Sequence, residues 1–325
     1  MTLKTGQKKK ADYRYSLKNY SKNGFEGAKL RAFYVIMIPF LILFLAVKLY
    51  PFLWGFYISM TNFTGFNLGN LKFVGLSNFK RVFSDSEALP SIVRVVKIGL
   101  VTVPVQLVLT LSLSMLLCKP RKGVGVFRTL MYLPSVLPML AVTIMWRQMY
   151  AYNGGMINTI LELLGIGRVN WFGYEHARTA LIIMMLYGCT GGILAKIAAI
   201  NNVPAELYEA AYLEGCGPIR KMVKITLPMI SNIIYMDVLL SIIGTLQLFA
   251  QPVFLAGSST GNTADSLTAT PIEPLYTYLV HIYQQIFVNM RFGYGLALVW
   301  VIFIIIMLIT LIMESTKKFW VFKED

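Results

Sequence analysis

The sequence is poor in charge, cysteine and histidine, and each shortage narrows what the protein can be. Only 14% of its 325 residues are charged and 56% are hydrophobic, a composition that does not suit a water-soluble globule. Cys118, Cys189 and Cys216 are too few and too irregularly spaced for a disulfide framework or a zinc site. His176 and His281 fall in expected outer loops, where a solvated side chain is a better interpretation than a metal ligand.

Motifs for catalysis and phosphate binding are missing as well. No G-x-x-x-x-G-K-[ST] loop occurs, so the chain lacks the backbone amides and the lysine that would cradle ATP. No H-E-x-x-H helix occurs either, and no group of residues resembles a catalytic centre. The sequence therefore predicts a protein that is not itself an enzyme and that needs no metal or cofactor.

What the sequence has instead is a series of long uncharged apolar runs. A bilayer core about 30 Å thick needs roughly 20 apolar helical residues to cross, and the alternating pattern of a membrane-spanning strand is absent. The prediction is an all-α integral membrane protein. Its six transmembrane helices are expected near residues 32–58, 94–118, 127–149, 178–198, 226–255 and 291–314.

Basic residues outnumber acidic ones by 30 to 15, and the loops in which they lie predict how the chain is oriented in the membrane. The tail 1–31 carries nine Lys and Arg residues, and the loops 119–128 and 196–224 and the tail 314–325 carry four, four and three. The segments between them, 60–90, 150–178 and 257–291, carry only three, two and one. Because cationic loops resist translocation, both termini and the tails 1–31 and 317–325 are predicted to be cytoplasmic. The net charge of +15 thus reflects topology and contact with membrane lipid, and it does not indicate a nucleic-acid partner.

The most specific pattern lies in the loop between the fourth and fifth spans. Pro204 and nearby acidic residues favour a short helix there, and Gly215 and Gly217 break it. By composition alone the loop is an ordinary amphipathic segment on the membrane surface. Its spacing is more particular, reading E-A-A, three residues, G, nine residues, I-x-L-P, with Glu209, Ala210, Ala211, Gly215, Ile225, Leu227 and Pro228 in these places.

This pattern resembles the signature loop of permease subunits from bacterial ABC importers. The resemblance implies that residues 203–225 form a coupling helix and elbow that dock into a groove of a separate ATP-hydrolysing subunit. It implies that Glu209 is an acidic contact to that subunit, that Ala210 and Ala211 allow close approach, and that Gly215 makes the elbow.

Weaker motifs resemble the carbohydrate-type permeases, such as those for maltose, multiple sugars and glycerol-3-phosphate. They are Phe73-Val-Gly-Leu-Ser-Asn-Phe79, Val103-Pro-Val-Gln-Leu107, Phe127-Arg-Thr-Leu130 with Leu133-Pro134, and Phe292-Gly-Tyr-Gly295.

The resemblance covers residues 30–316 and implies the type I ABC importer permease fold, within a permease domain of residues 32–316, in a bacterial inner membrane. The implied partners are a second similar permease, two ATPase subunits and an extracytoplasmic solute-binding protein. The implied substrate is a sugar or oligosaccharide, moved by alternating access.

Polar residues in the predicted fifth span form a second candidate site. At about 100° per residue, Asp237, Ser241, Gly244, Gln247 and Gln251 lie on one helix face. An acidic group within a membrane helix faces the bundle interior or a wet pathway, so this stripe is a candidate substrate surface. Hydrogen bonding between helices is an equally open alternative. Further candidates, which helix packing explains more simply, are Tyr187, Thr190 and Trp300.

A rival hypothesis is a self-contained secondary transporter or channel that uses Asp237 as a proton or cation site. It predicts transport driven by an ion gradient without an ATPase, and it leaves the E-A-A loop unexplained.

The segment 257–272, rich in Ser, Thr, Gly and Asn, is expected to be an exposed outer loop. It either meets the solute-binding protein or only connects two helices, and an amphipathic stretch near 275–288 follows it.

Overall fold

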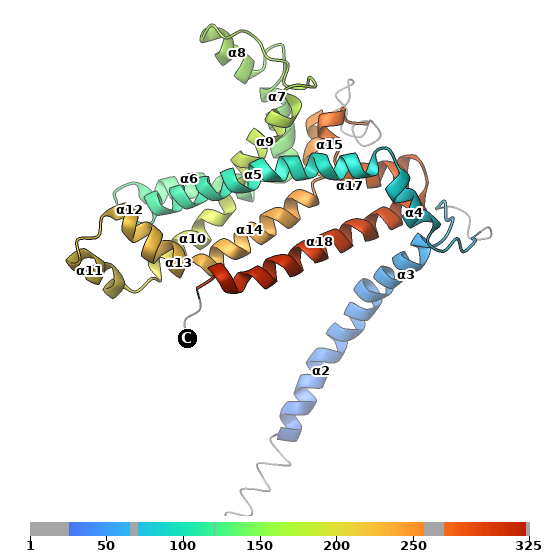
Figure 1. The fold of residues 1–325 in the computed structure, drawn as a ribbon, viewed down its shortest axis with the longest axis horizontal. Coiled ribbons are helices and arrows are strands. Elements are labelled where there is room, and N and C mark those ends of the chain that lie inside the picture. Colours follow the sequence, from blue (N-terminus) through green and yellow to red (C-terminus); the bar gives the residue numbers. More distant parts are fainter. Residues whose placement is uncertain (1–25, 66–70, 120, 257–269, 323–325) are drawn as a thin grey trace, which may run out of the picture. The chain divides into compact units, whose positions relative to one another are not determined.

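A computed structural model describes residues 26–65, 71–119, 121–256 and 270–322 (Figure 1). These described residues are helical almost throughout, with one isolated antiparallel bridge between Thr61 and Phe73. This confirms the all-α prediction for the described part of the chain. Most of the basic tail 1–31 and of the loop 257–272 lies outside the described residues.

The chain divides into two units, 1–58 and 59–325. The first unit contains α2 (Glu26–Phe44), the π-helical turn η2 (Leu45–Leu49) and α3 (Tyr50–Ser59). They form one stretch whose most apolar window has a mean hydropathy of 2.5. Because apolar residues lie on all its sides, lipid or another membrane chain has to cover it.

The second unit holds the remaining elements. They are α4 (Ser77–Ser84), α5 (Ala88–Leu117), α6 (Val124–Val136), α7 (Met139–Met149), α8 (Met156–Leu163), α9 (Ala177–Gly188), η4 (Cys189–Gly191), α10 (Gly192–Asn201), α11 (Ala205–Leu213), α12 (Pro218–Lys221), η5 (Met222–Thr226), α13 (Leu227–Met229), α14 (Ser231–Leu246), α15 (Ala250–Ala256), η6 (Glu273–Leu275), α17 (Tyr278–Tyr283), η7 (Gln284–Val288) and α18 (Phe292–Trp320).

Four helical stretches among the described residues are long and apolar enough to cross a membrane. Two bent helix pairs raise the number to six if each pair is one span, namely α6 with α7, bent by 99°, and 218–229 with α14, bent by 72°. Pro138 precedes α7 at the first bend, where its missing N–H interrupts the helical hydrogen bonds. The four single stretches are Arg31–Ser59, Ala88–Leu117, Ala177–Asn201 and Phe292–Trp320.

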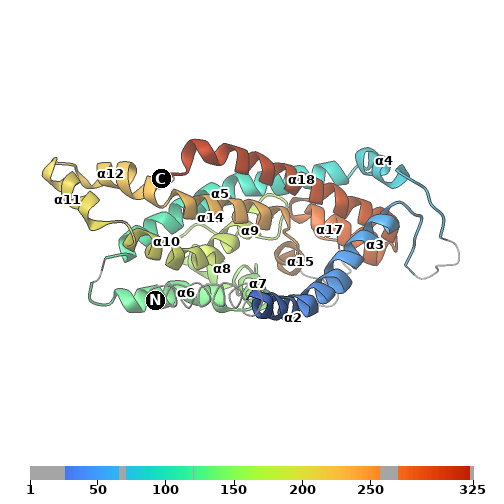
Figure 2. The ribbon, with the colours of Figure 1, turned by 90° about the horizontal axis from the view of Figure 1, so that it is seen from below.

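Helix α5 is central to the second unit. It packs against α9, α10 and α14, and α14 packs in turn against α18 (Figures 1 and 2). The buried hydroxyls of Thr102 and Ser114 donate to the carbonyls of Ile98 and Thr110, at 2.8 and 2.6 Å. These polar groups of α5 are therefore satisfied within their own helix.

The prediction of one continuous helix over 226–255 is wrong. Helix α14 ends at Leu246, Gln247 caps it, and α15 is a separate element. Pro252 gives the physical reason, because in a continuous helix its ring would meet the carbonyl four residues earlier, whereas it fits the first turn of α15. The stripe predicted from Asp237 to Gln251 therefore does not lie on one helix.

Two charged or titratable residues also lie elsewhere than expected. Lys196, counted among the residues of the loop 196–224, lies in α10 and is fully buried. His281, expected to be solvated in a loop, lies in α17 and is 2% exposed. Its segment, expected to be amphipathic over 275–288, is mostly buried because α5 and α18 pack against α17.

Two of the weaker sequence motifs meet in space. The Asn78 side chain donates to the carbonyls of Ser59 and Thr61, each at 2.8 Å. The backbone N–H of Gly293 donates to the Phe63 carbonyl at 2.9 Å. A Cβ at Gly293 would collide with the Thr61 carbonyl, so the absence of a side chain permits this close approach.

We expect Gly293→Ala to destabilise the protein by about 1–3 kcal/mol, because either the 61–63 segment or α18 has to move. The measurement is thermal unfolding of the purified protein in detergent. Gly244→Ala is the matched control, since no atom lies within 4 Å of a Cβ added there. Equal unfolding temperatures for both variants would contradict this account of the contact.

Candidate functional site

Helix α11 and the turn after it project from one end of the second unit (Figure 1). The helix begins directly after Pro204, and Gly215 beyond its end has a φ of +71°. The amide of Cys216 donates to the Ala211 carbonyl at 2.9 Å, and that of Gly215 to the Tyr212 carbonyl at 3.0 Å. This is the Schellman closure of a helix by a left-handed glycine, and it confirms the predicted helix and elbow.

The two alanines of the E-A-A pattern have different environments. Ala211 is 6% exposed and faces the rest of the chain, whereas Glu209 and Ala210 are exposed. Beside them Tyr212 and Leu213 are 75% and 86% exposed. Neighbouring exposed side chains of this size and apolar character indicate a surface that another protein or the membrane covers.

The other pattern residues hold the elbow. Ile225 packs against a buried cluster that contains Ile200, Val203 and Ile230, and Leu227 and Pro228 are half-buried. The hydroxyls of Tyr208 and Thr226 lie 2.9 Å apart and join α11 to η5.

The sequence analysis missed the pair formed by Tyr208 and Thr226. The available signal was Tyr208 three residues before Ala211, which places both on one helix face.

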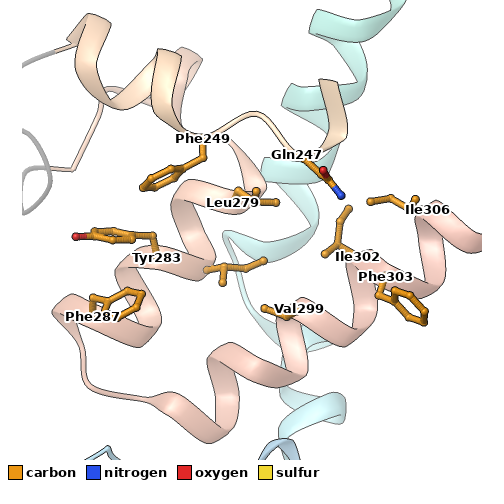
Figure 3. Close-up of a pocket in the computed structure, with 10 residues that line it drawn as sticks. Gln247, Phe249, Leu279, Tyr283, Phe287, Val299, Ile302, Phe303 and Ile306 are labelled. Carbon is orange, nitrogen blue, oxygen red and sulfur yellow. The ribbon is translucent and has the colours of Figure 1, made fainter. Parts of the chain in front are cut away.

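A cavity of about 670 Å³ lies among α14, α17, η7 and α18. Figure 3 shows the aromatic rings of Phe249, Tyr283 and Phe287 along one side and the Gln247 amide near Ile302 and Ile306. The Tyr283 ring centroid is 5.0 Å from the centroids of both Phe249 and Phe287. Of the predicted stripe, Gln247 lines this cavity, and the aromatic residues around it are ones that the sequence analysis missed.

The other residues of the predicted stripe make different contacts. Asp237 pairs with Lys196, their Oδ2 and Nζ atoms 2.6 Å apart. The Ser241 hydroxyl accepts a hydrogen bond from the Gln106 amide at 3.2 Å. Gln251 lies in α15, beyond the end of α14.

The three additional candidates do not lie together with Gln247 around the cavity. Tyr187 packs edge-on against Trp146, with ring centroids 5.5 Å apart, and Thr190 lies in η4, 9% exposed. Trp300 packs against Phe303, which itself lines the cavity.

An ionic cluster lies at the end of α5 remote from α11. The Arg94 guanidinium, itself 8% exposed, pairs with Glu87 at 2.9 Å and with Glu273 at 3.2 Å. Tyr174 donates to Glu273 at 2.9 Å. The hydrogen bonds from Tyr174 and then Arg94 hold the pKa of Glu273 below its ordinary value. The cluster fixes η6, which leads into α17.

A second polar cluster fixes α17 itself. The Nδ1 atom of His281 lies 3.0 Å from the Tyr276 hydroxyl, and its Nε2 atom lies 3.5 Å from the Asp85 carboxylate. Asp85 also accepts a hydrogen bond from Tyr294 at 2.5 Å. Burial lowers the pKa of His281 below its ordinary 6.5, although the Asp85 charge opposes this shift.

Comparisons with known proteins agree with this geometry. A family model described as binding-protein-dependent transport system inner membrane component matches residues 107–319, well over half of the chain. The chain belongs to this family. The permease fold expected from the sequence, that of a type I ABC importer, is thereby confirmed, and the chain is a multi-pass membrane component of a transport system.

Individual relatives cover three quarters or more of this permease. The probable ABC transporter permease protein YesP of Bacillus subtilis is 30% identical over 298 residues, which cover 90% of this chain and 92% of that protein. The trehalose/maltose transport system permease protein MalF of Thermococcus litoralis is 31% identical over 250 residues, covering 76% and 84%.

A solved structure has the same fold as this permease. It is the bacterial alginate ABC transporter in complex with an alginate pentasaccharide-bound periplasmic protein. One of its chains superposes with a TM-score of 0.76 over 91% of this chain and 97% of that chain, at 17% sequence identity.

We expect the stability of the permease to fall as the pH drops below 6.5. Below pH 6.5 the unfolded chain takes up a proton at His281, whereas the buried ring stays neutral to lower pH, so acid favours unfolding. In the variant His281→Gln, the unfolding temperature should fall less steeply below pH 6.5 than it does in the wild type. His176→Gln, which removes an exposed ring, is the control and should keep the wild-type slope.

Proposed function

We propose that this permease forms half of the translocation pathway of an ABC importer for a sugar or oligosaccharide. In this proposal it crosses a bacterial inner membrane six times with both termini in the cytoplasm. It works with a second similar permease, two ATPase subunits and an extracytoplasmic solute-binding protein. The observation that carries the proposal is the exposed surface of Glu209, Ala210, Tyr212 and Leu213 on a helix rigidly closed at its elbow.

The contacts of α11 suggest how ATP hydrolysis would reach the substrate. A push on α11 passes through the Tyr208–Thr226 contact into η5, and α14 begins immediately after the 72° bend that follows the segment 218–229. Helix α14 is 16 residues, or about 24 Å, long and ends at Leu246, and Gln247, which caps it, lines the cavity. Movement of the ATPase subunits would thus change the cavity without any direct contact to it.

The lining of the cavity suits a sugar. Aromatic rings offer flat surfaces to the C–H faces of a pyranose, and the Gln247 amide offers both a donor and an acceptor to hydroxyls. The name of the Thermococcus relative points to the same class of substrate. The ion-coupled alternative has no observation in its favour, because the Asp237 charge already has Lys196 as a partner.

Co-purification from the native membrane tests docking. The wild-type permease should bring an ATPase subunit with it, whereas Glu209→Lys and Leu213→Glu should each lower its recovery at least about tenfold, because each disrupts the exposed surface of α11. Leu163→Glu is the matched control, since Leu163 on α8 is 82% exposed and lies outside the coupling loop. Wild-type recovery with both α11 variants would contradict docking at this surface.

Uptake of a panel of radiolabelled sugars by cells carrying the complete transporter tests the cavity. Tyr283→Ala should lower uptake of the preferred sugar by about tenfold, because it removes the central ring, while the ATPase subunit still co-purifies. Phe83→Ala, which removes an exposed ring of α4, should leave uptake unchanged. If Tyr283→Ala cells take up the sugar at the wild-type rate, the substrate path does not use this cavity.

A further inference from the structure

The ion pair of Lys196 and Asp237 lies inside the helical bundle. The Lys196 side chain is fully buried and that of Asp237 is 19% exposed. Gly192, one turn before Lys196, leaves the space that the pair needs. A Cβ added there would lie 3.0 Å from Asp237 Oδ1 and 3.1 Å from Lys196 Nζ. The Lys196 charge is thus fully enclosed, and its contact with Asp237 depends on the close fit of the helices at Gly192.

The two partners stand on the two helices that flank the coupling loop. Lys196 is five residues before the end of α10, and Asp237 is six residues after the start of α14. At 1.5 Å per residue, both lie about 8–9 Å from the helix ends that lead to the loop. The pair therefore joins the two arms of the loop at matching depths.

Stability alone does not account for such a pair. Removing two charges from water costs free energy that their attraction often fails to recover, and apolar residues of similar volume are commonly as stable. What the pair does fix is the position of α10 along α14, that is, the register of the two helices. If α10 slid along α14 by one turn, about 5.4 Å, the buried ammonium group of Lys196 would lose its carboxylate, which is costly within a membrane.

Neutral links join the same helices to α5. The single proton of the Ser114 hydroxyl is shared between the Thr110 carbonyl at 2.6 Å and the Ile193 carbonyl of α10 at 3.2 Å, and the Gln106 amide donates to the Ser241 hydroxyl of α14 at 3.2 Å. Loss of such a neutral hydrogen bond costs far less than loss of one partner of a buried charge pair. The direct connection between α10 and α14 is thus the one most sensitive to displacement.

We propose that Lys196 and Asp237 are positioning residues that fix the register of α10 and α14, so that both arms of the coupling loop move as one lever. The movement rests on the proposed function, because an ATPase subunit has to supply the push. The register is a property of this chain alone. The two parts can therefore be tested separately.

Disulfide cross-linking in native membranes tests the register. Asn202→Cys on the α10 side is combined in turn with Met229→Cys, Asn232→Cys or Ile233→Cys, since these four positions line one small cavity between the arms. The three native cysteines are first replaced by alanine. With the ion pair intact, we expect one combination to form most of the cross-linked product.

Replacing the pair by Lys196→Met with Asp237→Leu should spread the product over at least two combinations, with a threefold or greater rise in a minor one. Lys196→Arg, which keeps the pair, should retain the wild-type pattern. Gln106→Leu with Ser241→Ala is the matched control: it breaks a neutral hydrogen bond between helices and should also retain the wild-type pattern.

If the apolar double variant does not accumulate, Asp237→Asn removes the charge attraction at nearly unchanged side-chain shape and should spread the cross-linked product in the same way. A single unchanged product in the variant without the ion pair overturns the proposal.

Adding ATP to the purified complex tests the lever. The wild-type cross-linking pattern should not change with ATP, because both arms move together, whereas that of the apolar variant should change. A wild-type pattern that shifts with ATP overturns the lever. Should no ATPase subunit accompany the wild type, the lever is overturned together with the proposed function, and the result in membranes still decides the register.

Discussion

Polar groups between the packed helices of this permease depend on partners within the protein, because hydrocarbon offers none. The hydroxyls of α5 donate to carbonyls of their own helix or of α10, and Gln106 bonds to Ser241 on α14. Lys196 and Asp237 satisfy each other. These contacts are few, and each therefore constrains how the surrounding helices can be arranged.

Ion pairs and hydrogen bonds also shape the end of the second unit remote from α11, where the carboxylates of Glu87 and Glu273 are about half exposed. Arg94 forms ion pairs with Glu87 and Glu273. Asp85 accepts a hydrogen bond from Tyr294 and lies beside His281. Both clusters pin the segment of η6 and α17, a short irregular stretch between longer helices. Because Leu279 and Tyr283 of this segment line the cavity, the clusters set the shape of a surface that they do not themselves contact.

At the opposite end, the residues of the coupling loop that hold α11 in place differ from the residues that form its exposed surface. Tyr208, Ala211 and Ile225 face the chain and fix the helix, while Glu209, Tyr212 and Leu213 face outward. A recognisable sequence pattern thus mixes two physical roles, since some of its residues shape the surface and others form it. Mutations within one motif are expected to act by different routes for this reason.

The sequence by itself determined the membrane character, the helical class, the short helix with its glycine elbow and the family, because apolar run length, charge placement and motif spacing are local properties of the chain. Tertiary structure decided the rest. Lys196 sits close enough to the end of its helix to be counted as a loop residue, and its burial depends on Asp237, 41 positions away. His281 is buried because α5 and α18 cover α17. The cavity combines Gln247 with rings from segments distant in sequence, and no periodicity within one segment can reveal which distant side chains share a space.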